Sequence, residues 1–244
     1  MAQKRAILFD LFFTLIDPLK DELFRESEYA VLDMERSEFE QWNEVDYDLR
    51  ASGKIRGPYN VFRHIVRGRV IDEALLLRAA DARLERIRRA LCGVEEQKLA
   101  LLKKLRKLGF RICLVSNADD MDKHHWQDSP LRACFDQTIF SCDAGLLKPD
   151  PRIYRLALER LGLEPAAERL GQCIYVGDGG HEELRGAGEA GMTTVLTTEY
   201  ITQVWPEKIP ALRQNADYEV ARLEDILPII NDCCSKTEVL GQQP

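Results

Sequence analysis

The stretch that decides the fold is Arg5-Ala-Ile-Leu-Phe-Asp-Leu-Phe-Phe-Thr-Leu15. Its residues 6–9 form an unbroken apolar run, which is typical of a strand buried on both faces. Asp10 follows at the carboxyl end of that strand, where ligands bind in open α/β sheets, so its carboxylate is a candidate for chemistry. On this stretch alone, an Asp that only caps the next turn explains the pattern equally well. The other strands have to separate the two interpretations.

The composition bounds the class of protein. A chain of 244 residues is long enough for one α/β domain or for a core domain with a smaller insert. A hydrophobic fraction of 45% is ordinary for a globular protein, and no apolar run is long enough for a membrane span. A formal net charge of -7 argues against nucleic acid as the main partner. We therefore expect a small-molecule substrate and neither a membrane nor a nucleic-acid partner.

The cysteines and the N-terminus indicate a cytoplasmic protein. The chain holds seven cysteines, an odd number without CxxC or Cys/His metal spacing, and several lie within apolar strand-like runs. Buried thiols of a reducing compartment explain them most simply. The first residues lead straight into a strand, without the apolar core and cleavage site of a secretory signal.

Between residues 17 and 91 strand-like runs give way to helical periodicity. One helix face is predicted from Leu76, Ala80, Leu84, Ile87 and Leu91. The opposite, polar face of that helix is assigned Arg83, Glu85, Arg88 and Arg89. Gly53 and the pair Gly57-Pro58 indicate turns between shorter helices. We predict a helical domain over 17–91, inserted into a core of residues 1–16 and 92–232, with a disordered tail at 233–244.

From Glu95 onward helices and strands alternate. Helices are expected around residues 95–108 and from Pro151 to Leu161. Strands are expected at Ile112–Val115, Thr138–Phe140, Cys173–Val176, Thr193–Leu196 and Asp217–Val220. Two-residue hairpins are missing between these strands, which favours parallel pairing through helices. The predicted fold class is α/β, a Rossmann-like, doubly wound parallel sheet with an inserted α-helical domain.

Polar groups follow three of these strands. The first strand ends at Asp10, the second at Ser116-Asn117 and the fourth at Asp178, while Lys148 precedes a helix that starts on the same side. Each alone is weak evidence, because Ser-Asn after a strand often caps a helix and a lone Lys is usually solvated. Together they suggest a site, since carboxylates at neighbouring strand ends suit Mg²⁺.

These residues match the motifs of a known family in the expected order. Over nearly its whole length the chain resembles the haloacid dehalogenase superfamily. The first motif matches at Asp10 and Thr14, the second at Ser116, the third at Lys148 and the fourth at Gly177-Asp178, Glu183 and Gly186-Ala187. The helical insertion is similar to the small cap domain of that superfamily.

The resemblance implies a role for each motif residue. Asp10 would be the nucleophile that forms an aspartyl intermediate, Ser116 would bind the transferring group and Lys148 would neutralise charge. The implied catalytic set is Asp10, Thr14, Ser116, Asn117 and Lys148. The implied Mg²⁺ ligands are Asp10, the backbone carbonyl of Phe12, Asp178 and Glu183, with Glu182 the rival of Glu183. Cations are needed because a carboxylate near a phosphate meets repulsion of roughly 4 kcal/mol per charge pair at about 4 Å and an effective dielectric near 20.

Phe12 is the departure from the family pattern. Phosphatases of the family carry an acid there, which protonates the leaving oxygen and activates water; such groups contribute about 10²- to 10⁴-fold in rate. We expect a Mg²⁺-dependent phosphatase of a small phosphorylated metabolite, at reduced efficiency. One alternative is a 2-haloacid dehalogenase, because those enzymes resemble this chain in carrying an aromatic residue at that position. Another alternative is a catalytically weak protein of this fold that binds a phosphorylated ligand or has a regulatory role.

Four residues outside the catalytic and metal sets are candidates for contacts with the rest of the substrate. Arg50, Arg56 and Arg63 in the insertion are candidates for an acidic group of the substrate, because guanidinium donors suit carboxylate and phosphate. For any one of them, a solvated arginine is the more common explanation. His181 lies in the loop of the fourth motif and is a candidate for supplying the missing proton, with an exposed loop histidine as the alternative.

Overall fold

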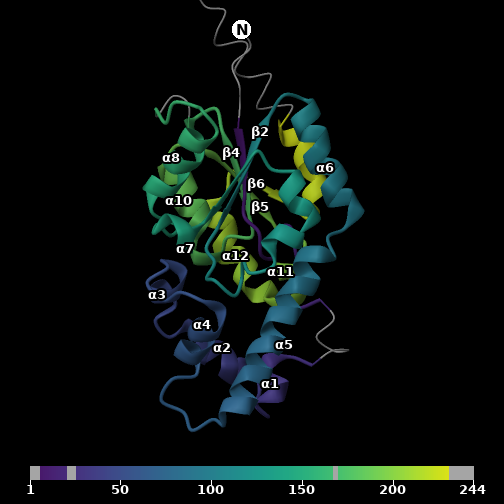
Figure 1. The fold of residues 1–244 in the computed structure, drawn as a ribbon. Coiled ribbons are helices and arrows are strands. Elements are labelled where there is room, and N and C mark those ends of the chain that lie inside the picture. Colours follow the sequence, from purple (N-terminus) through teal and green to yellow (C-terminus); the bar gives the residue numbers. More distant parts are fainter. Residues whose placement is uncertain (1–5, 21–25, 167–169, 231–244) are drawn as a thin grey trace, which may run out of the picture.

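The computed structural model describes residues 6–20, 26–166 and 170–230. At its centre lies a six-stranded sheet with the order β3-β2-β1-β4-β5-β6, in which every pairing is parallel (Figure 1). The strands are β1 (Ala6–Phe9), β2 (Arg111–Ser116), β3 (Gln137–Phe140), β4 (Ile174–Gly177), β5 (Thr193–Thr197) and β6 (Tyr218–Val220). The predicted doubly wound parallel sheet is confirmed, with each strand end within one residue of its expected position.

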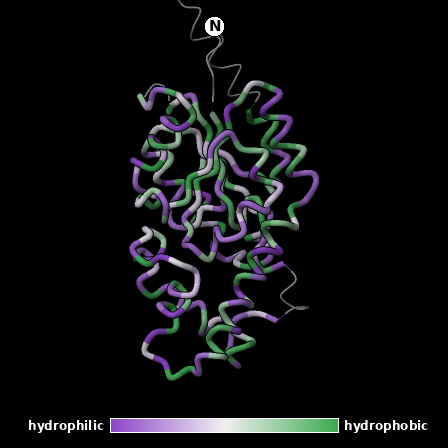
Figure 2. Tube along the Cα trace, viewed as in Figure 1, coloured by the Kyte–Doolittle hydropathy of each residue, from purple (hydrophilic) through white to green (hydrophobic). Residues whose placement is uncertain are grey.

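Strand β1 is buried on both faces, as its apolar run predicts. Ile7 and Phe9 belong to a core cluster shared with α6 (Glu96–Lys107), whereas Leu8 belongs to a second cluster with α8 (Pro151–Arg160) and α10 (Glu183–Glu189). Helices thus cover both faces of the sheet, and the hydropathy colours show the apolar strands enclosed between them (Figure 2). The strand order puts β1 at the middle of the sheet. Asp10, which follows β1, therefore lies at the centre of the edge formed by the carboxyl ends of the strands.

The remaining helices of the core are short. They are α7 (Ser141–Ala144), α11 (Ile201–Val204) and α12 (Ile209–Leu212). In the described residues no helix combines the length and the apolar character that crossing a membrane requires. The five described cysteines are free thiols; four of them are buried, as expected: Cys113, Cys134, Cys142 and Cys173.

The predicted insertion forms a helical unit next to the carboxyl ends of the strands (Figure 1). Its helices are α1 (Glu28–Val31), α2 (Arg36–Glu44), α3 (Tyr47–Ala51), α4 (Pro58–Ile65) and α5 (Glu73–Cys92). The unit has its own apolar cluster, which contains Phe39, Phe62 and Leu84. The last turns of α5 leave this cluster: Ile87 and Leu91 belong to the core cluster that the sheet shares with α6. The domain limits at 17 and 91 stay a prediction, and the predicted tail at 233–244 lies outside the described residues.

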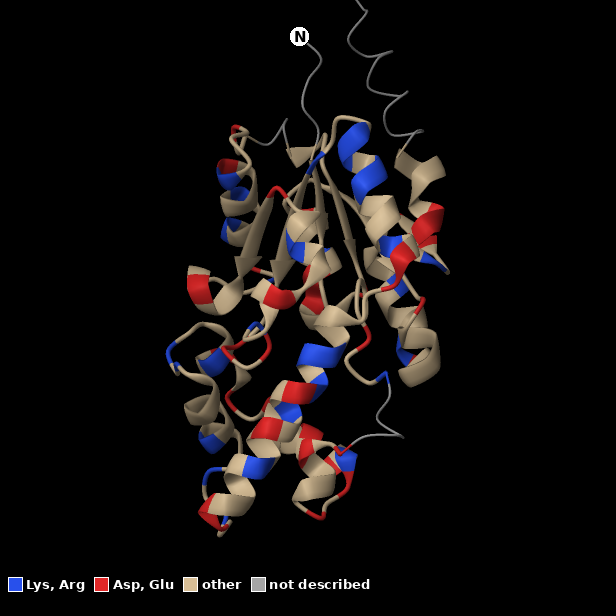
Figure 3. Ribbon diagram, turned by 45° about the vertical axis from the view of Figure 1, so that its right-hand side comes forward, with Lys and Arg blue, Asp and Glu red and all other residues tan. Residues whose placement is uncertain are grey.

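Arginines of α5 correct one expectation. Arg83 was expected on the exposed polar face, but its side chain is buried and its Nη2 lies 3.1 Å from Asp122 Oδ1. Arg86, one turn later, is paired with buried Glu28 through Nε at 3.0 Å and Nη2 at 2.5 Å. These two arginines are buried because the acids that neutralise them come from α1 and from the loop after β2. Figure 3 shows the charged bands that run along this helix towards the sheet.

The buried pair of Arg86 and Glu28 gives a test of this network. Replacing Arg86 with Met is expected to lower the free energy of unfolding by about 3–5 kcal/mol, because the Glu28 carboxylate loses its closest cation. Urea denaturation followed by circular dichroism measures the change. Arg213→Met is the control: it breaks an exposed pair with Glu219 and should cost much less, because exposed ion pairs contribute little to stability. Equal losses for the two variants would contradict a buried network.

Candidate active site

Asp10 lies at the centre of the sheet edge. Its backbone N–H donates to the carbonyl of Val176 in β4 at 2.9 Å, which fixes the chain just beyond the end of β1. Its Oδ1 accepts from Lys148 Nζ at 2.5 Å, and its Oδ2 accepts from Thr14 Oγ1 at 3.3 Å. The carboxylate is buried, and burial and Glu183 together raise its pKa to about 6, against the opposing effect of Lys148.

Lys148 reaches this carboxylate from a loop before α8. Its Nζ also contacts Glu183 Oε2 at 2.5 Å and the hydroxyl of Tyr175 at 3.0 Å. Burial by itself would lower the pKa of Lys148, but Asp10 and Glu183 raise it above its ordinary value. The ammonium therefore keeps its proton and holds the two carboxylates together.

Ser116 and Asn117 lie where β2 ends, but only one of them lines the cavity described below. The amide of Asn117 forms two hydrogen bonds with the backbone of Lys148: its Oδ1 accepts from the N–H at 2.8 Å and its Nδ2 donates to the carbonyl at 3.0 Å. Asn117 thus positions the lysine. The side chain of Ser116 is fully buried, and its Oγ lies 3.4 Å from the carbonyl of Asn117.

The fourth motif brings its second acid inward through two glycines. A Cβ on Gly177 would come within 2.0 Å of Glu183 Oε1, so only glycine leaves room for that carboxylate. A Cβ on Gly186 would come within 2.5 Å of the Pro149 carbonyl, so this glycine allows α10 to pack against the loop of Lys148. Glu183 is buried, whereas Glu182 is exposed and paired with Arg185. Of the two rivals, the structure brings Glu183 to the site.

Three carboxylates and one ammonium meet at this edge of the sheet. Asp10, Asp178 and Glu183 each offer an oxygen, and these oxygens lie within 4.8 Å of one another. Burial, Glu183 and Asp10 raise the pKa of Asp178 well above its usual value, because Lys148 alone does not balance the charge. Asp178 is oriented by a hydrogen bond from Gly180 N–H to its Oδ1 at 3.1 Å. A cluster of buried carboxylate oxygens with too little positive charge beside it suits a hard divalent cation such as Mg²⁺.

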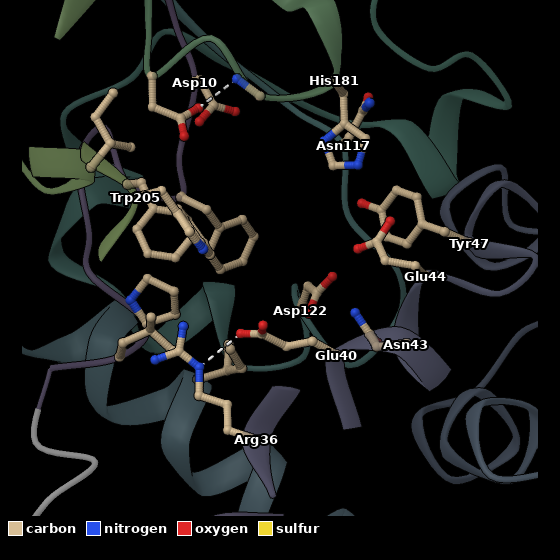
Figure 4. A pocket seen from close by; sticks show the side chains of 18 of the residues that line it. Asp10, Arg36, Glu40, Asn43, Glu44, Tyr47, Asn117, Asp122, His181 and Trp205 are labelled. Atoms are coloured by element: carbon tan, nitrogen blue, oxygen red, sulfur yellow. Dashed lines mark hydrogen bonds and ion pairs between the residues drawn. The ribbon is translucent and has the colours of Figure 1, made fainter. Parts of the chain in front are cut away.

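This cluster opens into a cavity of about 600 Å³ between the sheet and the helical unit. Figure 4 shows Asp10 and His181 at one end of the cavity, Arg36 and Glu40 at the other, and Trp205 facing Tyr47 and Glu44 across it. Phe12 also lines it. The cavity has the size of an ordinary small-molecule site.

Of the expected substrate contacts, only His181 lies in this cavity. Its ring stacks on Tyr47 of α3 with the ring centroids 5.0 Å apart. Arg50 does not line the cavity: it is fully buried, with its Nε 3.3 Å from Asp119 and its Nη2 2.6 Å from the Asn43 carbonyl. This arginine holds α3 to the loop after β2.

The other two arginines are also engaged elsewhere. Arg56 is exposed and its Nη1 lies 3.2 Å from both Asp120 and Asp143. Arg63 is exposed and paired with Glu73 at 2.5 Å. Neither lines the cavity of Asp10. All three arginines are therefore structural contacts in this arrangement, because acids distant in sequence neutralise them.

Sequence reasoning missed Tyr175 and the cap side of the cavity. Tyr175 reads as one apolar member of a buried strand, but its hydroxyl also donates to Glu183 Oε2 at 2.7 Å. Tyr47, Glu44 and Trp205 belong to segments without a motif. Only the alternation of side chains along β4 could have indicated where Tyr175 lies. Tyr175 points to the same face of the sheet as Cys173, towards α8 and α10.

The comparisons with known proteins agree with this geometry. A family model described as haloacid dehalogenase-like hydrolase matches residues 4–191, more than half of the chain. The chain therefore belongs to the haloacid dehalogenase-like hydrolases, as its motifs suggested, and the helical unit corresponds to the cap insertion expected of such a protein.

Individual relatives divide between two chemistries. A glyceraldehyde 3-phosphate phosphatase of Methanopyrus kandleri is 28% identical over 212 residues, which span 78% of this chain and 82% of that protein. L-2-haloacid dehalogenase from Xanthobacter autotrophicus superposes with a TM-score of 0.62 at 18% identity, over 94% of this chain and 99% of that one. The HAD-hydrolase YfnB from Bacillus subtilis, bound to magnesium, superposes with a TM-score of 0.64 at 19% identity, over 94% and 99%. The two structures share the fold with this chain.

Tyr175 provides a test of how the cluster is held. Tyr175→Phe is expected to lower the free energy of unfolding by about 1.5–3 kcal/mol, because its hydroxyl bonds two charged groups. The matched control is Tyr154→Phe, whose hydroxyl donates to the Glu183 backbone carbonyl and should cost about 0.5–1.5 kcal/mol. Urea titrations compare the two variants. A smaller loss for Tyr175→Phe than for Tyr154→Phe would contradict a role in holding the charged cluster.

Proposed function

We propose that this hydrolase is a Mg²⁺-dependent phosphatase of a small phosphorylated metabolite, in which Asp10 is the nucleophile. The observation that carries the proposal is the set of three carboxylates, Asp10, Asp178 and Glu183, gathered around one lysine. A dianionic phosphate would bring still more negative charge to this place. A bound Mg²⁺ would supply the positive charge that lets phosphate and carboxylate approach.

The roles of the chain's own residues follow from their contacts. Lys148 orients Asp10 Oδ1 and keeps its charge close to the attacked group, and Thr14 holds Oδ2. Asp178 and Glu183, with the backbone carbonyl of Phe12, would hold the cation. Asn117 keeps Lys148 in place through its backbone. His181 is proposed to contact the leaving part of the substrate, because it lines the cavity. The proposed role of Ser116, to bind the transferring group, is supported by the family motif alone, since its side chain is buried outside the cavity lining.

Charge favours this function over dehalogenation. The attacked carbon of a 2-haloacid carries no charged oxygens, unlike the attacked phosphorus of a phosphate ester, so dehalogenation gives less reason to gather Asp178 and Glu183 beside the nucleophile. The phosphatase relative matched over 82% of its length agrees with this preference. A cytoplasmic location is part of the same proposal, since phosphorylated metabolites and reduced thiols are found there.

One observation favours a second candidate, a 2-haloacid dehalogenase. Phe12 lines the cavity at the position where phosphatases of the family carry an acid, and a departing halide needs no proton. A structural neighbour is such a dehalogenase. The two candidates share Asp10 as nucleophile and differ in the need for a cation.

A substrate screen separates the candidates. Phosphate release from a panel of phosphate monoesters is expected with Mg²⁺, and both a chelator and Asp10→Asn should reduce it by at least about 10³-fold, since the nucleophile or its charge neutralisation is lost. Halide release from 2-chloropropionate, insensitive to chelator, would instead establish the dehalogenase. Tight binding of phosphate analogues without turnover would indicate a regulatory protein.

Cation binding can be measured without turnover. Isothermal titration calorimetry should give one Mg²⁺ site that Asp178→Asn weakens at least about tenfold, because one carboxylate ligand becomes neutral. Asp143→Asn is the matched control: Asp143 belongs to a second acidic group with Asp120 and Cys142, but Arg56 and Lys123 already neutralise it. Equal weakening by both variants, or no effect of Asp178→Asn, would count against the assigned ligands.

A further inference from the structure

Part of the wall of the Asp10 cavity is hydrocarbon, and it begins with the two residues of the loop after the nucleophile. Phe12 and Phe13 follow the nucleophile in the chain and both line its cavity. Phe13 meets Trp205 edge to face, with ring centroids 4.9 Å apart, and Ile201 lines the same cavity. A leaving group in this cavity would therefore meet aromatic and aliphatic surface from the core side.

The loop that carries Phe12 is fixed by its own backbone. Leu15 N–H donates to the Leu11 carbonyl at 2.9 Å, and Phe13 N–H donates to the Ile16 carbonyl at 2.7 Å. Phe12 itself pairs with Ile16 in an isolated bridge. A different side chain at position 12 would consequently start from the same backbone position beside the cavity.

Other donors near Asp10 include Lys148 and, at the same end of the cavity, His181 (Figure 4). Lys148 Nζ directs its hydrogens to Asp10, Glu183 and Tyr175. Tyr47 and His181 stack on each other across the cavity from Trp205 (Figure 4). Position 12, where an acid would give its proton to the leaving oxygen, offers only a benzyl group.

From these observations, and resting on the proposed phosphatase function, we infer a substrate class. The substrates are phosphate esters and anhydrides whose leaving group departs as a stable anion, namely aryl and acyl phosphates, and the phosphorylated Asp10 accumulates during turnover. Both parts have the same cause. The missing side chain would have protonated the leaving oxygen in the first step and activated water in the second.

The two steps balance without an acid at position 12. In the first, an Asp10 oxygen bonds to phosphorus, the bond from phosphorus to the leaving oxygen breaks, and the leaving group takes the electron pair as an aryl oxide or carboxylate. In the second, water bonds to phosphorus and the bond to Asp10 breaks. The products are the Asp10 carboxylate, hydrogen phosphate and one proton, which passes to solvent. An alkoxide is too basic to leave in this way, so alkyl phosphates react slowly.

A series of para-substituted phenyl phosphates tests the first step, because its members differ in the acidity of the phenol far more than in size. We expect kcat/KM to rise steeply as the phenol becomes more acidic, with 4-nitrophenyl phosphate at least about 10²-fold above propyl phosphate. Acetyl phosphate tests whether acyl phosphates are substrates as well. Stopped-flow detection of 4-nitrophenolate should show a burst that approaches one equivalent per enzyme, followed by slower turnover.

Variants at position 12 separate acidity from space. Phe12→Asp should raise kcat/KM for propyl phosphate by about 10²-fold, flatten the dependence on phenol acidity and remove the burst. Phe12→Asn, which opens the same space without an acid, should do none of these. Circular dichroism melting curves check that both variants are folded. The burst is measured on the unchanged protein, so that test does not depend on the folding of any variant.

Contrary results are equally specific. Propyl phosphate turnover within tenfold of 4-nitrophenyl phosphate, the absence of a burst, or equal effects of Phe12→Asp and Phe12→Asn would overturn the inference while leaving the phosphatase intact. A steeper dependence in His181→Asn than in the unchanged protein would show that the imidazole protonates the leaving oxygen, and would overturn it as well. No phosphate release from any substrate would refute the phosphatase itself, and the inference with it.

Discussion

The contact between the Lys148 ammonium and the Asp10 carboxylate is the interaction on which the rest of the site depends. Lys148 also binds Glu183 and Tyr175, so one buried cation joins elements that are far apart in the sequence. Asn117 fixes its backbone, and the glycines at 177 and 186 leave the space that its partners occupy. Because one lysine faces three carboxylates, the cluster keeps a negative excess, and this excess is the physical reason for proposing a divalent cation.

The helical unit completes the cavity and also limits what its own residues can do. Arg50 and Arg83 are buried against Asp119 and Asp122 of the loop after β2, and these pairs hold the unit over the sheet. Arg86 pairs with Glu28 inside the unit. Breaking such buried pairs is costly. The surface left for a substrate is therefore aromatic beside Asp10 and polar around Glu44 and Tyr47. Leaving-group chemistry is accordingly decided beside the nucleophile, at Phe12.

The sequence predicts the sheet well because its strands are buried on both faces, which leaves a local signal in each apolar run. The ends of β1, β2 and β4 could be matched to one site because parallel strands bring their carboxyl ends together. The choice of Glu183 over Glu182 rested on the register of the family motif and not on a local structural pattern. In the structure the position of Glu183 depends on His181 and Glu182, whose positive φ values of 50° and 55° turn the chain so that the next side chain points inward.

Long-range partners were also beyond local patterns. Arg50 looks like a substrate contact until its buried partner, Asp119, is known, and that acid lies 69 residues away. Arg83 falls on the polar face of its helix by periodicity, yet its own side chain is buried because Asp122 lies opposite. Tyr175 is indistinguishable from its apolar neighbours until its hydroxyl is placed beside Lys148 and Glu183.

The central claim is that Asp10 accepts a phosphoryl group at a site completed by a cation. A crystal structure of the protein with Mg²⁺ and beryllium fluoride tests it most directly. The account predicts a beryllium trifluoride group bonded through beryllium to one Asp10 oxygen and Mg²⁺ bound by Asp10 and Asp178, with Lys148 still in contact with the cluster. Fluoride bound away from Asp10, or a site without Mg²⁺ between Asp10 and Asp178, would contradict it.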